Sequence, residues 1–280
     1  MNKTLAIFEL MRLDKPIGIY LLLWPALLAL VISSNGNFEY VDLIIVIIGS
    51  ILVRSAGCVI NDIWDKDLDG GVERTKTRPI PSKKLSISES WVVFAVLSIL
   101  SLMLLSLTNA NTILISICFG LMIVVYPLTK RFFIGPQIFL GLTFNPTIIV
   151  YAMTNELNNP TMIFLYLAIA AKTIAFDSFY GLCDIEDDKK LGINSTPLWW
   201  GSKTLLIIAI LQFAVISFLL IVGLKAELSS AWYIGIILLS GFYFYQHQLA
   251  SQKNFLLAFK NNHWASLYLL TLSVFCFLII

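Results

Sequence analysis

The sequence predicts an all-α integral membrane protein that crosses the bilayer nine times, and two observations carry this prediction. Hydrophobic residues make up 58% of the 280 positions and charged residues only 13%, with a mean hydropathy of +0.85. A soluble globular domain has more polar surface than this composition supplies. The apolar residues are also gathered into long stretches, close to the ~20 residues that a helix needs to cross a bilayer.

The apolar stretches follow one another along most of the chain. They are continuously apolar and lack strict alternation, so we expect helices, which satisfy their own backbone polar groups in lipid, and not barrel strands. The first stretch follows Arg12 and Lys15 and has no cleavage pattern after it, so we expect it to be a retained span. The nine predicted spans are residues 16–34, 41–60, 91–108, 111–128, 133–152, 161–182, 202–224, 231–247 and 263–280.

The basic residues predict the orientation. With nine spans, 16 of the 19 Lys and Arg residues fall on one side of the membrane and only Lys225 on the other, while Arg54 and Lys172 lie within spans. The positive-inside tendency then places the N-terminus in the cytoplasm and the C-terminus outside. The longer loops, at residues 61–90, 183–201 and 248–262, lie on the cytoplasmic side and carry most of the polar chemistry.

An acidic cluster closes the second apolar stretch. Asp62, Asp65 and Asp69 are spaced by three and four residues, which places them on one helical face beside Asn61. Like charges at a helix C-terminus repel one another and are disfavoured by the helix dipole. Carboxylate and amide oxygens suit Mg²⁺, so a divalent cation site explains the arrangement. The alternative is a solvated cap at the membrane surface, which we expect only for Asp67 because it lies off the shared face.

A second acidic cluster follows the sixth apolar stretch. Asp184 and Asp188 share a helical face, with Asp177 two turns earlier and Tyr180 between them. A carboxylate within a bilayer is costly, which makes Asp177 a candidate functional residue. Arg54 and Lys172 fall under the same argument, and the sequence leaves open which of them pairs with a buried acid.

Basic residues follow the first acidic cluster. Arg74 and Arg78 stand close behind the carboxylates, where they suit the oxygens of a phosphate or diphosphate group. The alternative, ordinary positive-inside signalling, explains the excess of charge but not its position. His247 and His263 have no motif around them, so we expect both at the membrane interface.

The sequence resembles the UbiA superfamily of intramembrane aromatic prenyltransferases, and its hydroxybenzoate branch in particular. The resemblance covers nearly the whole chain, so we expect one domain over residues 1–280. One departure is Glu186, where many relatives are expected to have Asp. The stretches that carry the resemblance are residues 12–18, 22–25, 61–69, 74–75, 78–79, 126–131, 136–137, Tyr180, 184–188 and 192–196.

The resemblance implies a fold and an activity. It implies nine transmembrane helices around a central cavity and Mg²⁺-dependent transfer of a polyprenyl group from a polyprenyl diphosphate to 4-hydroxybenzoate, at the ring carbon ortho to the hydroxyl. The reaction belongs to ubiquinone biosynthesis, with the active site on the cytoplasmic side of a bacterial inner membrane.

The resemblance also implies roles for individual residues. Mg²⁺ and the diphosphate would be held by Asn61, Asp62, Asp65, Asp69, Asp184 and Asp188, assisted by Arg74, Arg78 and Lys130. Arg131 is the candidate for binding the acceptor carboxylate, because a guanidinium group matches a carboxylate bidentately. Arg54, Asp14 and Tyr180 are further candidates for contact with substrate.

Two alternative functions remain open at this point. Relatives in the same superfamily prenylate other acceptors, namely homogentisate, dihydroxynaphthoate or haem. A cation-coupled secondary transporter also places acidic residues at a membrane site, but it would have them near the midplane, whereas most of these lie at the cytoplasmic mouth.

Overall fold

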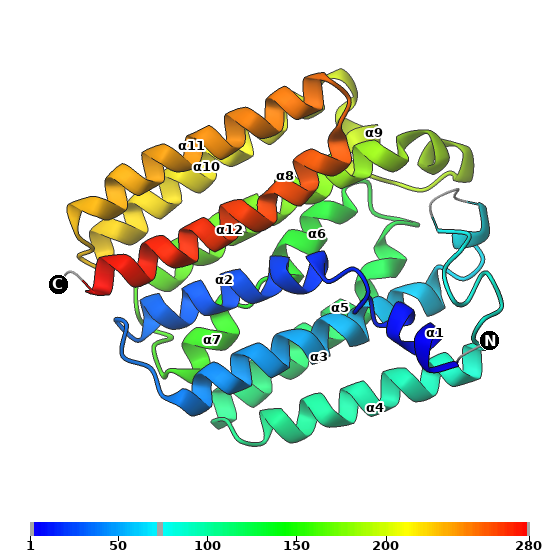
Figure 1. Ribbon diagram of the computed structural model, residues 1–280, viewed down its shortest axis with the longest axis horizontal. Coiled ribbons are helices and arrows are strands. Elements are labelled where there is room, and N and C mark those ends of the chain that lie inside the picture. Colours follow the sequence, from blue (N-terminus) through cyan, green and yellow to red (C-terminus); the bar gives the residue numbers. More distant parts are fainter. Residues whose placement is uncertain (1–2, 72–74, 279–280) are drawn as a thin grey trace.

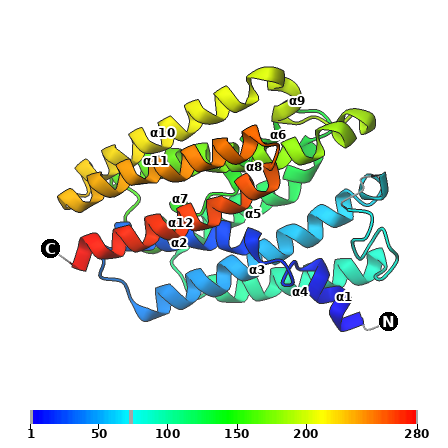
Figure 2. The same cartoon turned by 45° about the horizontal axis from the view of Figure 1, so that its top comes forward.

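The computed structural model describes residues 3–71 and 75–278, and helices are the only regular secondary structure in those ranges (Figure 1). The long helices run side by side along the long axis of the molecule in both ribbon views (Figures 1 and 2). The helices are α1 Lys3–Leu10, α2 Ile17–Ser33, α3 Tyr40–Trp64, α4 Ile87–Leu105, α5 Ala110–Thr129, α6 Pro136–Thr143, α7 Thr147–Met153, α8 Thr161–Leu191, α9 Thr196–Trp200, α10 Thr204–Lys225, α11 Ser230–Ser251 and α12 Phe255–Leu278, with 3₁₀ turns at Asp69–Gly71 and Gly201–Lys203.

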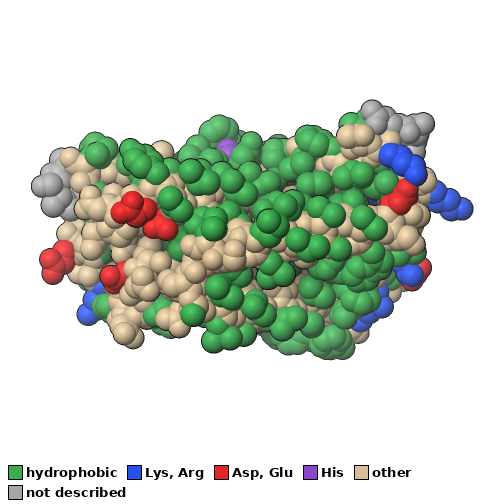
Figure 3. Space-filling model, turned by 90° about the horizontal axis from the view of Figure 1, so that it is seen from below, with side chains coloured by type: hydrophobic (Ala, Val, Ile, Leu, Met, Phe, Trp, Pro, Cys, Tyr) green, Lys and Arg blue, Asp and Glu red, His purple; other side chains and the backbone are tan. Residues whose placement is uncertain are grey.

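Helices occupy all nine of the predicted apolar segments. Five helical stretches are each long and apolar enough to cross a membrane, namely α3, α4, α5, α8 and the stretch Thr196–Lys225 that contains α10. The chain is therefore a multi-pass membrane protein, as the composition predicts. Figure 3 agrees, because hydrophobic side chains cover the middle of the molecule and charged side chains gather at its two ends.

The predicted span at 133–152 is broken into α6 and α7. Asn145 and Pro146 separate the two helices, and the Asn145 side chain donates to the Tyr166 carbonyl at 2.8 Å and accepts from the Thr147 backbone N–H at 3.2 Å. These bonds replace part of the backbone pairing that the break removes, which allows non-helical backbone inside a membrane protein.

Two predicted boundaries are wrong, and both errors affect the cavity. Helix α8 continues past residue 182 to Leu191, where Gly192 ends it with a left-handed φ of 66°. Helix α12 begins at Phe255 and not at 263, so the predicted loop 248–262 is largely helical. Its first turns carry polar residues that mask the apolar signal, although Ala258 and Phe259 are buried.

The helices form two packed groups, one around α8 and one around α3. Helix α8 contacts α6, α7, α10 and α12, while α3 contacts α2, α4 and α5. The largest buried cluster includes Leu30 of α2, Leu165 of α8, Leu219 of α10 and Trp232 of α11. The acidic residues of α3 and α8 therefore approach one space from two opposite helices.

Candidate active site

A cavity of about 1400 Å³ lies between the α3 and α8 sides. One end is polar, and the remaining length is lined mainly by apolar residues of α3, α4, α5 and α7, as far as Thr112 and Met153. The polar end brings together residues that are far apart in the sequence. The sequence-predicted site residues that line the cavity are Asp14, Arg54, Asn61, Asp62, Asp65, Asp69, Arg78, Lys130, Tyr180, Asp184 and Asp188.

The first acidic cluster does not lie on one continuous helix. Helix α3 ends at Trp64, and the chain then turns so that the Asp69 backbone N–H donates to the Asp65 carbonyl at 2.8 Å. The Thr75 hydroxyl donates to the Asp69 carbonyl at 2.8 Å and closes the loop. The prediction of a single helical face is thus wrong beyond Trp64, but Asp62 on α3 and Asp65 and Asp69 after it all line the cavity.

These carboxylates are buried and accept from cations of the same chain. Asp62 is 1% exposed, and one nitrogen of Arg12 contacts both of its oxygens at 2.7 Å. Arg78 bridges Asp62 at 3.1 Å and Asp69 at 2.7 Å. Lys130 donates to Asp65 at 3.0 Å. Arg78 and Lys130 are therefore placed beside the acids, as expected for groups that share a diphosphate with them.

The mutual burial of these charges shifts their ionisation. Burial raises the pKa of Asp69, and the nearby charge of Arg78 offsets this only in part. Burial lowers the pKa of Lys130, but the charge and hydrogen bond of Asp65 more than compensate, and the net pKa is raised. Lys130 is thus held as a cation at the mouth.

The donor set fits a hard divalent cation. Asp65 is 4% exposed, and its Oδ1 oxygen has no hydrogen-bond partner in the described residues, while Asn61 donates to its other oxygen at 3.1 Å. A buried carboxylate oxygen without a partner is costly unless a ligand satisfies it. Within residues 3–71 and 75–278, no three His, Cys, Asp or Glu side chains are grouped so that they could hold a metal ion.

The second acidic cluster lies on one face of α8, as predicted. Asp177, Tyr180, Asp184 and Asp188 all line the cavity, because α8 continues through the cluster as a regular helix. Asp184 and Asp188 are half-buried. The two acidic clusters therefore face one cavity from α3 and α8.

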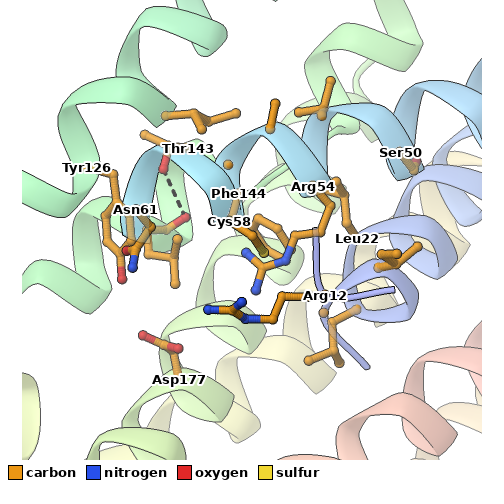
Figure 4. Close-up of a pocket in the computed structure, with 18 of the residues that line it drawn as sticks. Arg12, Leu22, Ser50, Arg54, Cys58, Asn61, Tyr126, Thr143, Phe144 and Asp177 are labelled. Atoms are coloured by element: carbon orange, nitrogen blue, oxygen red, sulfur yellow. Dashed lines mark hydrogen bonds between the residues drawn. The ribbon is translucent and has the colours of Figure 1, made fainter. Parts of the chain in front are cut away.

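Arg54 lies deeper than the other cations. Its guanidinium carbon lies 5.0 Å from the centre of the Phe144 ring, and its Nε is buried with no hydrogen-bond partner in the described part of the chain. A Cβ at residue 18 would lie 2.6 Å from this Nε, so Gly18 leaves the room that the guanidinium needs. Figure 4 shows Arg54 and Arg12 pointing into the same space as Asn61 and Tyr126, with Asp177 across from them.

Some predicted site residues are not brought to the cavity. Arg131 is exposed, does not line the cavity and donates to the Trp64 carbonyl at 2.7 Å, where it satisfies the end of α3. Arg74 lies outside the described residues. Lys172 donates to Ser266 at 2.5 Å and so connects α8 to α12.

Two cavity residues were missed by sequence reasoning. Arg12 lies in residues 12–18, which carry the family resemblance, but the sequence indicates no role for it. Its contact with Asp62 in the structure indicates one. His263 was expected at the membrane interface, but it lines the cavity and accepts from Trp24 Nε1 at 2.9 Å.

Two curated proteins are similar to this chain over most of its length. The chain is 40% identical to the 4-hydroxybenzoate octaprenyltransferase of Pseudomonas aeruginosa strain LESB58, over 92% of this chain and 89% of that protein. It is 39% identical to the 4-hydroxybenzoate octaprenyltransferase of Vibrio campbellii, over 95% of each chain.

Solved structures share the fold at low sequence identity. The apo structure of a UbiA homolog from Aeropyrum pernix K1 has a TM-score of 0.79 and 21% identity, covering 90% of this chain and 94% of that one. A UbiA homolog from Archaeoglobus fulgidus, bound to GPP and Mg²⁺, has a TM-score of 0.75 and 18% identity, covering 98% of this chain and 100% of that one. Residues 22–278 match the UbiA prenyltransferase family as a whole. The chain therefore belongs to the UbiA prenyltransferase family.

Proposed function

We propose that this chain transfers a polyprenyl group from a polyprenyl diphosphate to the ring carbon ortho to the hydroxyl of 4-hydroxybenzoate, a step of ubiquinone biosynthesis. One observation carries the proposal: two acidic clusters, the first of them paired with Arg78 and Lys130, line one polar end of an otherwise largely apolar cavity. A diphosphate head suits the charged end, and a prenyl tail suits the apolar length. The names of the curated relatives supply the acceptor.

The head of the donor would be bound by both acidic clusters. Asn61, Asp62, Asp65 and Asp69 on the α3 side and Asp184 and Asp188 on α8 would hold Mg²⁺. Bound Mg²⁺ supplies positive charge that neutralises the departing diphosphate. Arg78 and Lys130, which pair with Asp69 and Asp65 in the structure, would also donate to the departing diphosphate, and this would favour breaking of the allylic carbon–oxygen bond.

The tail would be bound by the apolar walls. Phe176, Phe259 and Tyr180 lie close together on α8 and α12, with ring centres 5.9 Å apart for Phe176 and Phe259 and 4.8 Å for Tyr180 and Phe259. Aromatic faces attract cations, and apolar walls exclude water. Both effects protect an allylic cation until the acceptor ring attacks it.

We assign the acceptor carboxylate to Arg54 in place of Arg131. Arg54 lines the cavity and its Nε has no hydrogen-bond partner within residues 3–71 and 75–278, whereas Arg131 is exposed. A carboxylate that accepted from Arg54 would direct the phenol ring toward Asn61 and Tyr126, near the donor head. Asp14 stands exposed at the rim, where contact with an entering substrate is its remaining role.

We place the polar mouth on the cytoplasmic side of a bacterial inner membrane, with nine spans and a cytoplasmic N-terminus. The asymmetry of Lys and Arg supports this orientation. Figure 3 shows that Lys and Arg side chains gather mostly at the end of the molecule where α1 lies. A water-soluble acceptor would then enter from the cytoplasm, and the lipid donor from the bilayer.

The activity is tested with purified protein in lipid vesicles. With octaprenyl diphosphate and 4-hydroxybenzoate we expect pyrophosphate release and a product whose mass is that of 4-hydroxybenzoate plus the octaprenyl group less one ring hydrogen, which leaves as the proton taken up by pyrophosphate. EDTA should abolish both signals, and Mg²⁺ in excess of EDTA should restore them. Homogentisate, dihydroxynaphthoate and haem serve as competing acceptors. Preferred turnover of one of these would replace 4-hydroxybenzoate, and no turnover of any acceptor would defeat the proposal.

Replacing Arg54 with Met should raise the KM for 4-hydroxybenzoate about 10- to 100-fold, the usual effect of losing a charged hydrogen-bond pair. The neutral analogue 4-hydroxybenzamide should be affected much less, because it lacks the carboxylate. Arg131→Ala is the matched control and should leave the KM for 4-hydroxybenzoate unchanged. Steady-state kinetics with saturating donor measures these KM values. An unchanged KM in Arg54→Met together with a raised KM in Arg131→Ala would assign the acceptor carboxylate to Arg131.

A further inference from the structure

Helix α1 ends in a backbone conformation that favours glycine, yet the residue there is Arg12. The Leu13 backbone N–H donates to the Phe8 carbonyl at 3.1 Å, and Arg12 has a φ of 59°. This is the hydrogen-bond pattern of a Schellman motif, in which the left-handed residue is usually Gly because a Cβ is disfavoured there. The Arg12 side chain is thus present despite a local backbone preference against it.

The guanidinium group of Arg12 is held from both sides. One terminal nitrogen donates to the Glu9 carbonyl at 2.9 Å, and the other contacts both oxygens of Asp62 at 2.7 Å. Glu9 in turn pairs with Lys84 at 2.8 Å, which fixes α1 to the loop before α4. Arg12 is therefore pre-oriented over one of the carboxylates that we assign to the metal.

The carboxylates of the first cluster differ in how many of their oxygens already have hydrogen-bond partners. Among the described residues, Asp62 accepts from Arg12 and Arg78, whereas Asp65 retains one buried oxygen without a hydrogen-bond partner there. A divalent cation arriving alone could use Asp65 but would meet repulsion from the arginines at Asp62. A diphosphate arriving with the metal would offer these arginines new oxygens, to which guanidinium groups bind strongly.

We propose that Arg12 is a selectivity latch. Its guanidinium group pairs with Asp62 and so disfavours binding of a free divalent cation there. When metal and diphosphate enter together, the guanidinium group leaves Asp62 and binds the diphosphate oxygens. This inference rests on the proposed function and assigns a role to Arg12 in it: the site binds the metal–diphosphate complex in preference to the metal alone. A residue with only a structural role would influence both kinds of binding in the same direction.

The test measures binding of Mn²⁺ to the full-length protein by electron paramagnetic resonance, with and without inorganic pyrophosphate. Arg12→Gly suits the backbone of the left-handed position, so its helix cap is preserved. Lys253→Gly is the matched control, because Lys253 also has a left-handed φ of 61° and carries one positive charge, but it is exposed and does not line the cavity. Arg12→Lys keeps the positive charge but lacks the two terminal nitrogens with which the guanidinium group contacts Glu9 and Asp62.

The expected effects have opposite signs. Arg12→Gly should bind free Mn²⁺ several-fold more tightly than the wild type, and should bind pyrophosphate in the presence of Mn²⁺ about 10-fold more weakly. Arg12→Lys should fall between the two in both measurements, and Lys253→Gly should match the wild type. Equal weakening of both affinities in Arg12→Gly, or no change in either, would overturn the latch. Saturable binding of Mn²⁺ with pyrophosphate by the wild type keeps the proposed function intact in that case, and its absence would defeat both.

Discussion

Replacing Asp65 with Asn is expected to lower kcat about 10²- to 10³-fold, the scale of losing one group that stabilises developing charge. The substitution keeps the shape of the side chain but removes the negative charge. It acts on the carboxylate whose Oδ1 oxygen has no partner in the described residues, and a neutral amide there would bind a divalent cation more weakly than the carboxylate does. Pyrophosphate release at saturating donor and acceptor measures the loss.

Asp67→Asn is the matched control for this prediction. Asp67 lies two residues away, is exposed and does not line the cavity. Its activity should stay within about twofold of the wild type, as for most surface substitutions. Thermal unfolding of both variants shows whether the Asp65 variant remains folded. Full activity in Asp65→Asn, or equal loss in the two variants, would remove Asp65 from the proposed metal site.

The chemistry of the mouth could be predicted from the sequence because charged residues stand out in an apolar chain. Asp62, Asp69 and Asp184 interrupt or follow apolar stretches, and such residues are costly enough in a membrane to need a function. The spacing of the acidic residues on α8 predicts one face correctly, since that helix continues through them. In the first cluster the same spacing argument fails after Trp64, because the helix ends there.

The partners of these charges could not be predicted in the same way. A basic residue near a membrane has a topogenic reason to be there, so its sequence position does not show whether it faces a cavity. Arg131 has the neighbours expected of a site residue and points outward, whereas Arg12 precedes the first span and reaches Asp62, fifty residues later. His263 was missed for another reason, because it stands at the first position of the predicted span 263–280, whereas α12 begins at Phe255 and places it two turns inside the helix.

Replacing Ser116 with Trp is expected to shorten the prenyl chains that the enzyme accepts. Ser116 is half-buried and lines the cavity on α5, about 20 Å from Thr129 at the end of that helix, at 1.5 Å per residue. One isoprene unit adds four chain carbons, roughly 5 Å of length with carbon–carbon bonds of ~1.5 Å. A geranyl chain of two units therefore ends before residue 116, whereas an octaprenyl chain must pass it or leave the cavity.

An indole at this depth removes space that only long donors use. The ratio of kcat/KM for octaprenyl diphosphate to that for geranyl diphosphate should fall at least about 10²-fold, because even one misplaced methylene group in an apolar site changes kcat/KM by about 10- to 200-fold. Leu114→Trp is the matched control on the same helix, since Leu114 is 64% exposed and does not line the cavity. An unchanged ratio in Ser116→Trp would mean that the tail leaves the cavity before it reaches α5 at this depth, and the determinants of chain length would then lie nearer the mouth.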